Sequence, residues 1–295
     1  MSGKTLKSIG LLILILFSSR LSNGQSKVIW EIGKADNKSE EMALAPAGYA
    51  KFLDQDFGWE DRFFLVGHSK AKTDFAYVLP GPDDGWGGTG PTSGLRTHHA
   101  NVLFGLKNKP INGTYKLTID LVGFQSITPA LLKVNINGKS YIKQLPKHSA
   151  DNAVAGDMKG AQEYIWEIPL TADQLKKGGN EVSLTTLDGS WIVFDQIRLT
   201  GTKTLQLTAS TTVFLRNITA AKYEILVDGK RYQPLLTDVQ HLSGKPMITV
   251  KLDGKQIFKE RLDSARYQFE VPMPAVRTKI NSRYEIYSDG MLLES

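Results

Sequence analysis

The most regular hydrophobic pattern in the chain is a strict alternation of apolar and polar residues. Residues 113–122 alternate with a period of two, and residues 132–136 and 141–145 repeat the pattern. Such alternation is typical of strands with one buried face. The dipeptide Asn137-Gly138 separates the last two runs, and Asn-Gly between alternating strands is a strong hairpin signal. These segments are therefore predicted to be neighbouring strands of a sheet.

Further apolar runs of strand length fill much of the first 200 residues. They lie at residues 28–33, 62–67, 99–106, 164–169, 182–187 and 190–199. Residues 171–178 instead suggest a helical turn, with Thr171 as its cap and Gly178 as its left-handed stop. We expect residues 26–201 to form an all-β sandwich, with Trp30, Trp166 and Trp191 in its core.

The composition and the hydrophobic pattern of the chain change after residues 201–204. Beyond that point the apolar runs are shorter, tryptophan is absent, and Asp-Gly pairs recur at residues 228–229, 253–254 and 289–290. Strands separated by turns at this spacing suggest a second, smaller immunoglobulin-like β-sandwich over residues 205–295. The chain ends five residues after the last turn signal, so we expect this domain to be truncated.

Residues 1–24 have the pattern of a secretory signal peptide. Lys4 and Lys7 precede an apolar run at residues 9–17, and Ser22 and Gly24 are small residues spaced for cleavage before Gln25. The apolar run is too short to span a bilayer, which needs about 20 residues. The chain has no cysteine. We therefore expect an exported bacterial protein, periplasmic or secreted, with no membrane span after removal of the signal.

The charge of the chain gives no sign of a nucleic-acid partner. The formal net charge is +6, and loss of the three cationic leader residues Lys4, Lys7 and Arg20 would reduce it to +3. No element combines clustered Lys or Arg with interleaved aromatic residues, so we expect no nucleic-acid binding.

A stretch rich in glycine and proline, residues 74–99, interrupts the strand pattern. Long irregular segments in compact domains are usually functional or disordered, and a tryptophan with adjacent acids argues against disorder. An indole ring can stack on the C–H face of a sugar while polar groups bond its hydroxyls. The predicted ligand-binding residues are Trp59, Trp86, Asp84, Arg96 and His98. The alternative is that the two tryptophans only close the end of the sandwich.

The sequence predicts no catalytic residues. It lacks a nucleophile elbow, a His-Glu-x-x-His motif, a phosphate loop and a dinucleotide fingerprint. The pairs Asp83-Asp84 and Glu60-Asp61 are sequence neighbours, whose side chains point in opposite directions on an extended chain. They are therefore poor acid–base pairs and suit turns better.

Two segments resemble a known family. Residues 30–36 resemble the Trp-x-Ile-Gly-x-x-Asp opening of the C-terminal jelly-roll module of rhamnogalacturonan lyases, and residues 190–199 resemble its closing strand. The resemblance covers residues 28–201 and implies a galactose-binding-like jelly roll that serves as a carbohydrate-binding accessory module. In those lyases the catalytic domain precedes the jelly roll, so no lyase catalytic residue can be assigned here. The order also resembles the N-terminal accessory region of a large bacterial glycoside hydrolase, such as an α-mannosidase-like enzyme.

Asp195 lies inside an apolar strand and needs an explanation because an unpaired buried carboxylate is costly. Either it points outward, or it binds a structural calcium ion together with Glu31 and Asp36. The calcium alternative rests on a further resemblance, because closing strands ending in Asp-x-Ile-x-Leu occur in calcium-containing carbohydrate-binding modules.

Three functions are compatible with these patterns. The first is an exported, non-catalytic carbohydrate-binding accessory region of a polysaccharide-degrading system. The second is a polysaccharide lyase or glycoside hydrolase, or an N-terminal fragment of one, which acts on pectic or mannose-containing glycans through Asp83, Asp84 or His98. The third is a structural spacer whose glycine-rich loop packs on a neighbouring catalytic domain.

Overall fold

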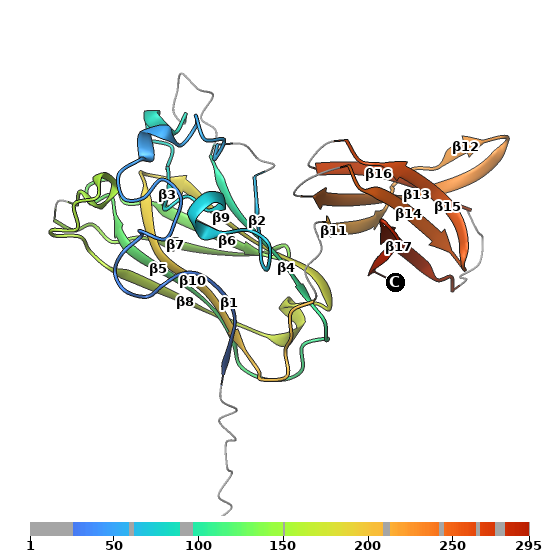
Figure 1. Cartoon of the computed structure of the whole chain (residues 1–295), viewed down its shortest axis with the longest axis horizontal. Coiled ribbons are helices and arrows are strands. Elements are labelled where there is room, and N and C mark those ends of the chain that lie inside the picture. The colour runs from blue at the N-terminus through green and yellow to red at the C-terminus, as the bar shows by residue number, and fades with distance from the viewer. Residues whose placement is uncertain are drawn as a thin grey trace, which may run out of the picture.

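The protein is built almost entirely from β-strands. A computed structural model describes residues 26–58, 62–88, 97–149, 151–208, 213–241, 245–263, 266–274 and 281–294. Figure 1 shows two β-bodies joined by the chain between β10 and β11. We call the first, formed by β1 to β10, the N-terminal sandwich and the second, formed by β11 to β18, the C-terminal unit.

The first sheet of the N-terminal sandwich has the order β1-β10-β5-β8, with β3 also paired to β10. All its pairings are antiparallel. Its strands are β1 (Lys27–Gly33), β3 (Val78–Leu79), β5 (Tyr115–Phe124), β8 (Tyr164–Leu170) and β10 (Ile192–Gly201).

The second sheet has the order β2-β4-β9-β6-β7, and only the short pairing of β2 with β4 is parallel. Its strands are β2 (Phe64–Leu65), β4 (His99–Leu106), β6 (Leu131–Ile136), β7 (Lys139–Gln144) and β9 (Gly178–Asp188). The turn between β6 and β7 is the predicted hairpin, with Asn137 and Gly138 both at positive φ.

The core of the N-terminal sandwich lies between these two sheets. Leu117 and Ile119 of β5 and Val102 and Phe104 of β4 have no exposed surface, as the alternation of the strands requires. Trp30 and Trp191 are buried and Trp166 packs on the core, which confirms their core assignment.

Short helices connect the strands. They are α1 (Ala71–Asp74), η1 (Tyr49–Lys51), η2 (Gly85–Gly87), η4 (Ala153–Ala155) and η5 (Ala172–Gln174). The helical turn predicted at residues 171–178 is confirmed only in its first part, as η5 capped by Thr171, where the Gln174 side chain accepts the Thr171 backbone N–H at 2.9 Å. The turn ends at Leu175, and Gly178, the predicted stop, begins β9. None of the helices in the described ranges is long and apolar enough to cross a membrane.

The C-terminal unit contains two antiparallel sheets. One has the order β11-β13-β12 with β16 also on β13, and the other has the order β15-β14-β17-β18. The strands are β11 (Val213–Ala220), β12 (Ile225–Val227), β13 (Lys230–His241), β14 (Met247–Leu252), β15 (Lys255–Arg261), β16 (Arg266–Pro274), β17 (Tyr284–Ser288) and β18 (Met291–Glu294). They enclose a separate apolar cluster that includes Val239, Val250 and Val271. That this unit is an independent immunoglobulin-like domain over residues 205–295 stays a prediction.

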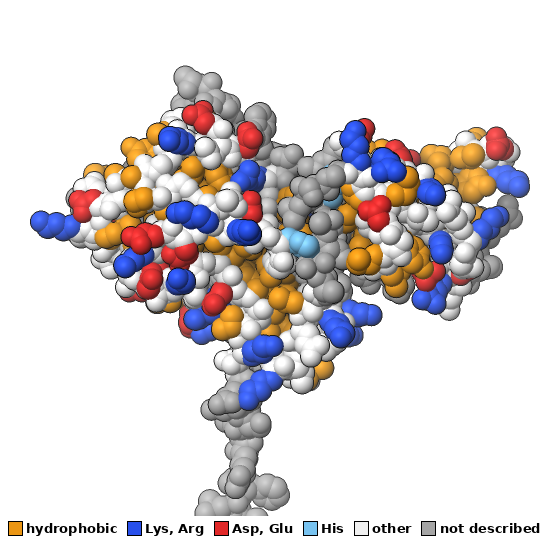
Figure 2. Space-filling view, in the orientation of Figure 1, with side chains coloured by type: hydrophobic (Ala, Val, Ile, Leu, Met, Phe, Trp, Pro, Cys, Tyr) orange, Lys and Arg blue, Asp and Glu red, His pale blue; other side chains and the backbone are white. Residues whose placement is uncertain are grey.

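Surface charge is mixed on the visible face. Figure 2 shows lysine and arginine side chains interspersed with aspartate and glutamate rather than gathered into one patch. This distribution agrees with the modest net charge and gives no electrostatic footprint for a nucleic acid on this face.

Candidate functional site

One end of the N-terminal sandwich carries the glycine-rich stretch and most of the predicted ligand residues. It is formed by η1, η2 and residues 81–88, together with residues 97–98 that lead into β4. Figure 1 shows short helical turns gathered at this end, away from the start of β1. We call it the loop end. Trp59 and Arg96, two of the predicted ligand residues, lie outside the described residues.

Asp84 holds the loop end together. Its Oδ2 accepts the backbone N–H of Gly81 at 2.7 Å, and its Oδ1 accepts the hydroxyl of Ser190 at 2.6 Å. The side chain is 6% exposed, and burial raises its pKa to about 6, although hydrogen bonds from Ser190, Gly81 and Trp86 act in the opposite direction. Asp84 therefore joins the β3–η2 segment to the turn before β10. We predicted that Asp84 contacts a ligand. The structure instead shows its carboxylate buried and bonded to Gly81 and Ser190, where it braces the loop.

His98 is the second brace. It is 3% exposed, its Nε2 bonds the carbonyl oxygen of Gly87, and its ring centroid lies 5.3 Å from that of Phe52. A buried imidazole with these partners braces the loop from within. As with Asp84, the structure places this residue where it positions the loop, and direct ligand contact by either residue stays a prediction.

Trp86 is the predicted ligand residue that retains exposed surface at the loop end. It sits in η2, half-buried, with its ring edge-on to Tyr49 at 5.1 Å and to Phe52 at 6.2 Å between centroids. Gly88, at φ +68°, ends η2 in a left-handed conformation that glycine adopts without strain. Trp86 and Tyr49 thus form a fixed aromatic corner that helps to close this end of the sandwich, and ligand contact by Trp86 stays a prediction.

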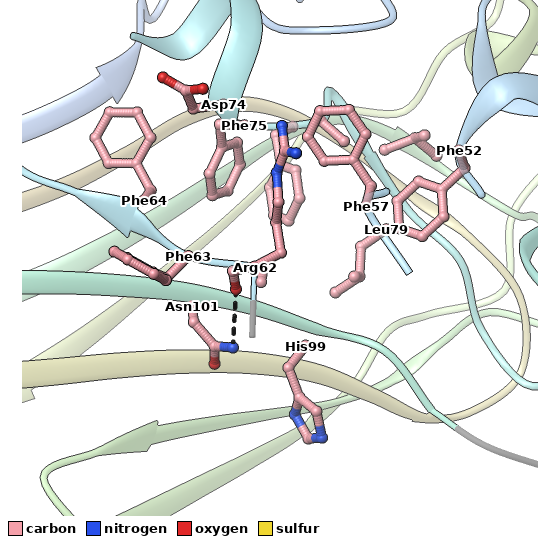
Figure 3. A pocket seen from close by; sticks show the side chains of 14 residues that line it. Phe52, Phe57, Arg62, Phe63, Phe64, Asp74, Phe75, Leu79, His99 and Asn101 are labelled. Atoms are coloured by element: carbon pink, nitrogen blue, oxygen red, sulfur yellow. Dashed lines mark hydrogen bonds between the residues drawn. The ribbon is translucent and has the colours of Figure 1, made fainter. Parts of the chain in front are cut away.

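A small cavity lies beside this corner, under Arg62 (Figure 3). Figure 3 shows the Arg62 guanidinium among phenyl rings, and its Cζ lies 4.3 Å from the centroid of Phe57. One guanidinium nitrogen donates to the carbonyl oxygen of Thr73 at 2.9 Å, and Asn101 donates to the carbonyl oxygen of Arg62 at 3.4 Å. The cavity measures about 30 Å³, which is room for water but not for a sugar ring.

Sequence reasoning missed Tyr49, Phe52 and Arg62. They come from segments with no alternation. Tyr49 and Phe52 are marked only by their contacts with Trp86, and Arg62 only by its contact with Phe57. Phe52 touches Trp86, His98 and Phe57, and so connects the aromatic corner with the Arg62 cavity. The aromatic residues between positions 49 and 57 were the only sequence signal for this part of the site, but the same spacing fits a buried core segment equally well.

Asp195 does not point outward, and its contacts differ from those of a calcium ligand. It has no exposed surface, and its carboxylate accepts backbone N–H groups from Asp36, Asn37 and Lys38 at 3.4, 3.2 and 3.2 Å. Burial raises its pKa, while these hydrogen bonds act against the rise. Glu31 instead accepts from Gln196 at 3.2 Å.

These contacts do not fit a calcium site at Asp195, Glu31 and Asp36. Three N–H donors aimed at the Asp195 carboxylate occupy the direction that a cation would need, and of Asp36 it is the backbone N–H that faces Asp195. Across the described ranges, no group of three or more His, Cys, Asp or Glu side chains could hold a metal ion.

The fold and the braced loop end define an all-β sandwich module. The family model "CBM-like: Polysaccharide lyase family 4, domain III" matches residues 28–199, which is more than half of the chain. The protein therefore belongs to this family, and the resemblance to rhamnogalacturonan lyase jelly rolls is confirmed.

A curated relative and two solved structures add to this picture. The chain is 25% identical over 183 residues to a rhamnogalacturonate lyase of Dickeya dadantii (strain 3937), which covers 59% of this chain and 28% of the lyase. A family 35 carbohydrate binding module from an environmental isolate matches at 19% identity and TM-score 0.27, over 39% of this chain and 72% of that module. A GH2 β-galacturonidase from Eisenbergiella tayi matches at 9% identity and TM-score 0.24, over 67% of this chain and 34% of the enzyme. The two structural matches are too loose to carry an argument about function.

Proposed function

We propose that the protein is an exported, non-catalytic accessory module that binds a pectic polysaccharide through the loop end of its N-terminal sandwich. Family membership supports a carbohydrate-binding-like role, and the relative named as a rhamnogalacturonate lyase supports a pectic ligand. The partner in this proposal is a catalytic domain or a neighbouring glycan-degrading enzyme. The signal-like residues 1–24 support export.

The aromatic corner of Trp86 and Tyr49 is the observation that carries the proposal. A half-buried indole on a braced loop offers a rigid apolar platform, and rigid contacts lose little entropy when a ligand binds. Arg62 is linked to this corner through Phe57 and then Phe52, and it keeps guanidinium N–H donors for the carboxylate of a uronic acid.

Calorimetry of the full chain tests this proposal. Rhamnogalacturonan oligosaccharides, mannan and galactan are titrated into wild type, Trp86→Ala, Trp86→Phe and Tyr223→Ala. We expect Trp86→Ala to weaken binding about 30-fold, as loss of a central aromatic contact does, and Trp86→Phe to retain part of the affinity. Tyr223 is an exposed aromatic residue of the C-terminal unit, at 47% exposure, so its change is the matched control.

Two results would contradict the proposal. No heat with any of these glycans, from a chain shown to be folded by circular dichroism, would remove the binding function. Turnover of rhamnogalacturonan or of aryl glycosides by the purified chain would remove the non-catalytic assignment.

A further inference from the structure

The N-terminal sandwich and the C-terminal unit meet through a specific contact. Phe214 of β11 packs with Phe63, Leu65 and Leu103 in one buried cluster. Gly179 of β9 leaves room for this approach, because a Cβ atom at that position would overlap the carbonyl oxygen of Leu215. The junction is therefore packed rather than a loose tether.

A polar groove of about 350 Å³ lies beside this junction. Its walls come from both bodies: Asn135, Lys176 and Glu181 from the N-terminal sandwich, and Arg216, Asn217 and Asp238 from the C-terminal unit. This volume falls within the range of about 300–1,000 Å³ that is typical of small-ligand clefts.

The floor of the groove is held rigidly. Arg216 forms an ion pair with Glu181 across the junction and donates to Gln240 at 2.9 Å. The turn residue Asn137 donates to Gln174 and Asn180, both at 2.8 Å, and accepts from the backbone N–H of Glu181 at 2.9 Å. These bonds tie the β6–β7 turn to the start of β9, so the wall that carries Asn135 is fixed before any ligand binds.

Some polar groups at the rim remain available. Within the described part of the chain, the Lys176 ammonium and the Asn217 amide make no hydrogen bond or ion pair. Arg216 commits its two terminal nitrogens to one partner each, and a guanidinium has five N–H donors. The groove thus presents unused donors and an unused amide oxygen above a rigid floor.

The side chains that line the groove indicate which class of ligand it suits. Two cations, Lys176 and Arg216, balance two anions, Glu181 and Asp238, so the groove favours neither a net anion nor a net cation. Among the described residues that line it, none is aromatic, which disfavours a flat apolar ligand. A neutral molecule with many hydroxyl groups can both donate and accept at such a surface.

We infer that this groove is a second saccharide site, which takes one or two rings of a neutral glycan. It uses residues different from those of the loop end, and it stands or falls independently of the function proposed for Trp86. Because it lacks a stacking ring, it binds more weakly than an aromatic platform and acts as an additional contact along a chain held elsewhere.

Ligand-observed saturation-transfer NMR on the full chain tests the groove, with galactobiose, mannobiose and cellobiose as neutral probes and digalacturonate as the charged one. The groove variants are Lys176→Met and Asn217→Leu, and Lys177→Met, which changes the next exposed lysine outside the groove, is the control. We expect a neutral disaccharide to bind in wild type, to lose about fivefold in affinity in each groove variant, and to be unaffected in Lys177→Met.

The loop-end variant Trp86→Ala separates the two sites. Binding that persists in Trp86→Ala but falls in the groove variants supports the inference. Three outcomes overturn it: no saturation transfer to any neutral disaccharide, equal binding in the groove variants and wild type, or preferential binding of digalacturonate.

Discussion

Changing Asp84 to Asn should alter how the stability of the protein depends on pH. The Asp84 carboxyl is 6% exposed, and burial raises its pKa from 3.8 to about 6. The folded state therefore holds this proton more tightly than the unfolded state does. As pH rises through the window between these two values, the free energy of unfolding must fall.

The magnitude follows from the size of the pKa rise. One pKa unit corresponds to about 1.4 kcal/mol, so ionised Asp84 costs the folded state about 3 kcal/mol at pH well above 6. About 2 kcal/mol of this develops between about pH 4.5 and about pH 8, because part of the ionisation cost is already present at the lower pH. Asparagine cannot ionise, so the variant lacks this pH-dependent loss of stability. It does lose the hydrogen bond from Gly81 or from Ser190, at every pH.

Urea unfolding of wild type and Asp84→Asn across this pH range measures the effect. We expect the stability of the variant relative to wild type to rise by about 2 kcal/mol from about pH 4.5 to about pH 8. The difference between the two proteins cancels the contributions of the other titrating groups. Asp120 is one of these groups, because burial raises its pKa to about 6. Asp83→Asn, at the exposed neighbouring position, is the control. A difference that does not change with pH would refute the burial of a titrating carboxyl at the loop end.

Further predictions concern the segment after β1. Asp195→Ala should lower the free energy of unfolding by about 2–4 kcal/mol, since three backbone N–H groups lose their acceptor; a loss under about 1 kcal/mol would contradict these bonds. Because the same carboxylate is saturated by N–H donors, neither calcium nor a chelator should shift the thermal unfolding midpoint of wild type. Gly33→Ala should destabilise by at least about 2 kcal/mol, since Gly33 has φ +82° and a Cβ there would overlap the carbonyl oxygen of Asp195; an unchanged melting curve would refute this close approach.

Local sequence patterns predicted much of the strand content and its turns. The pairs at residues 228–229, 253–254 and 289–290 all adopt positive φ at both positions, as tight hairpin turns require. The alternation of residues 113–122 became β5, whose alternate residues from Tyr115 are fully buried. These features depend on neighbours in sequence, which is why pattern reasoning could find them.

The roles of Asp84 and Asp195 could not be predicted in this way. Asp84 bonds Ser190, 106 residues away, and Asp195 bonds amides 157 to 159 residues away. A buried acid in an apolar strand indicates that the carboxylate has a partner. The sequence pattern is the same whether that partner is a cation or a cluster of backbone amides. The resemblance raised the calcium alternative, and the placement of residues 36–38 against β10 favours the backbone amides.

The same long-range bonds explain how a glycine-rich segment can serve as a binding surface. Residues 81–88 contain four glycines, so ordering them costs more backbone entropy than an average loop of that length. Asp84 fixes one end of the segment to the turn before β10, and His98 fixes Gly87 near the other. Trp86 lies between these two anchors, so the entropy of ordering the loop is lost on folding rather than on ligand binding. Under the proposed function, loosening either anchor should therefore weaken glycan binding, which calorimetry of Asp84→Asn and wild type would measure.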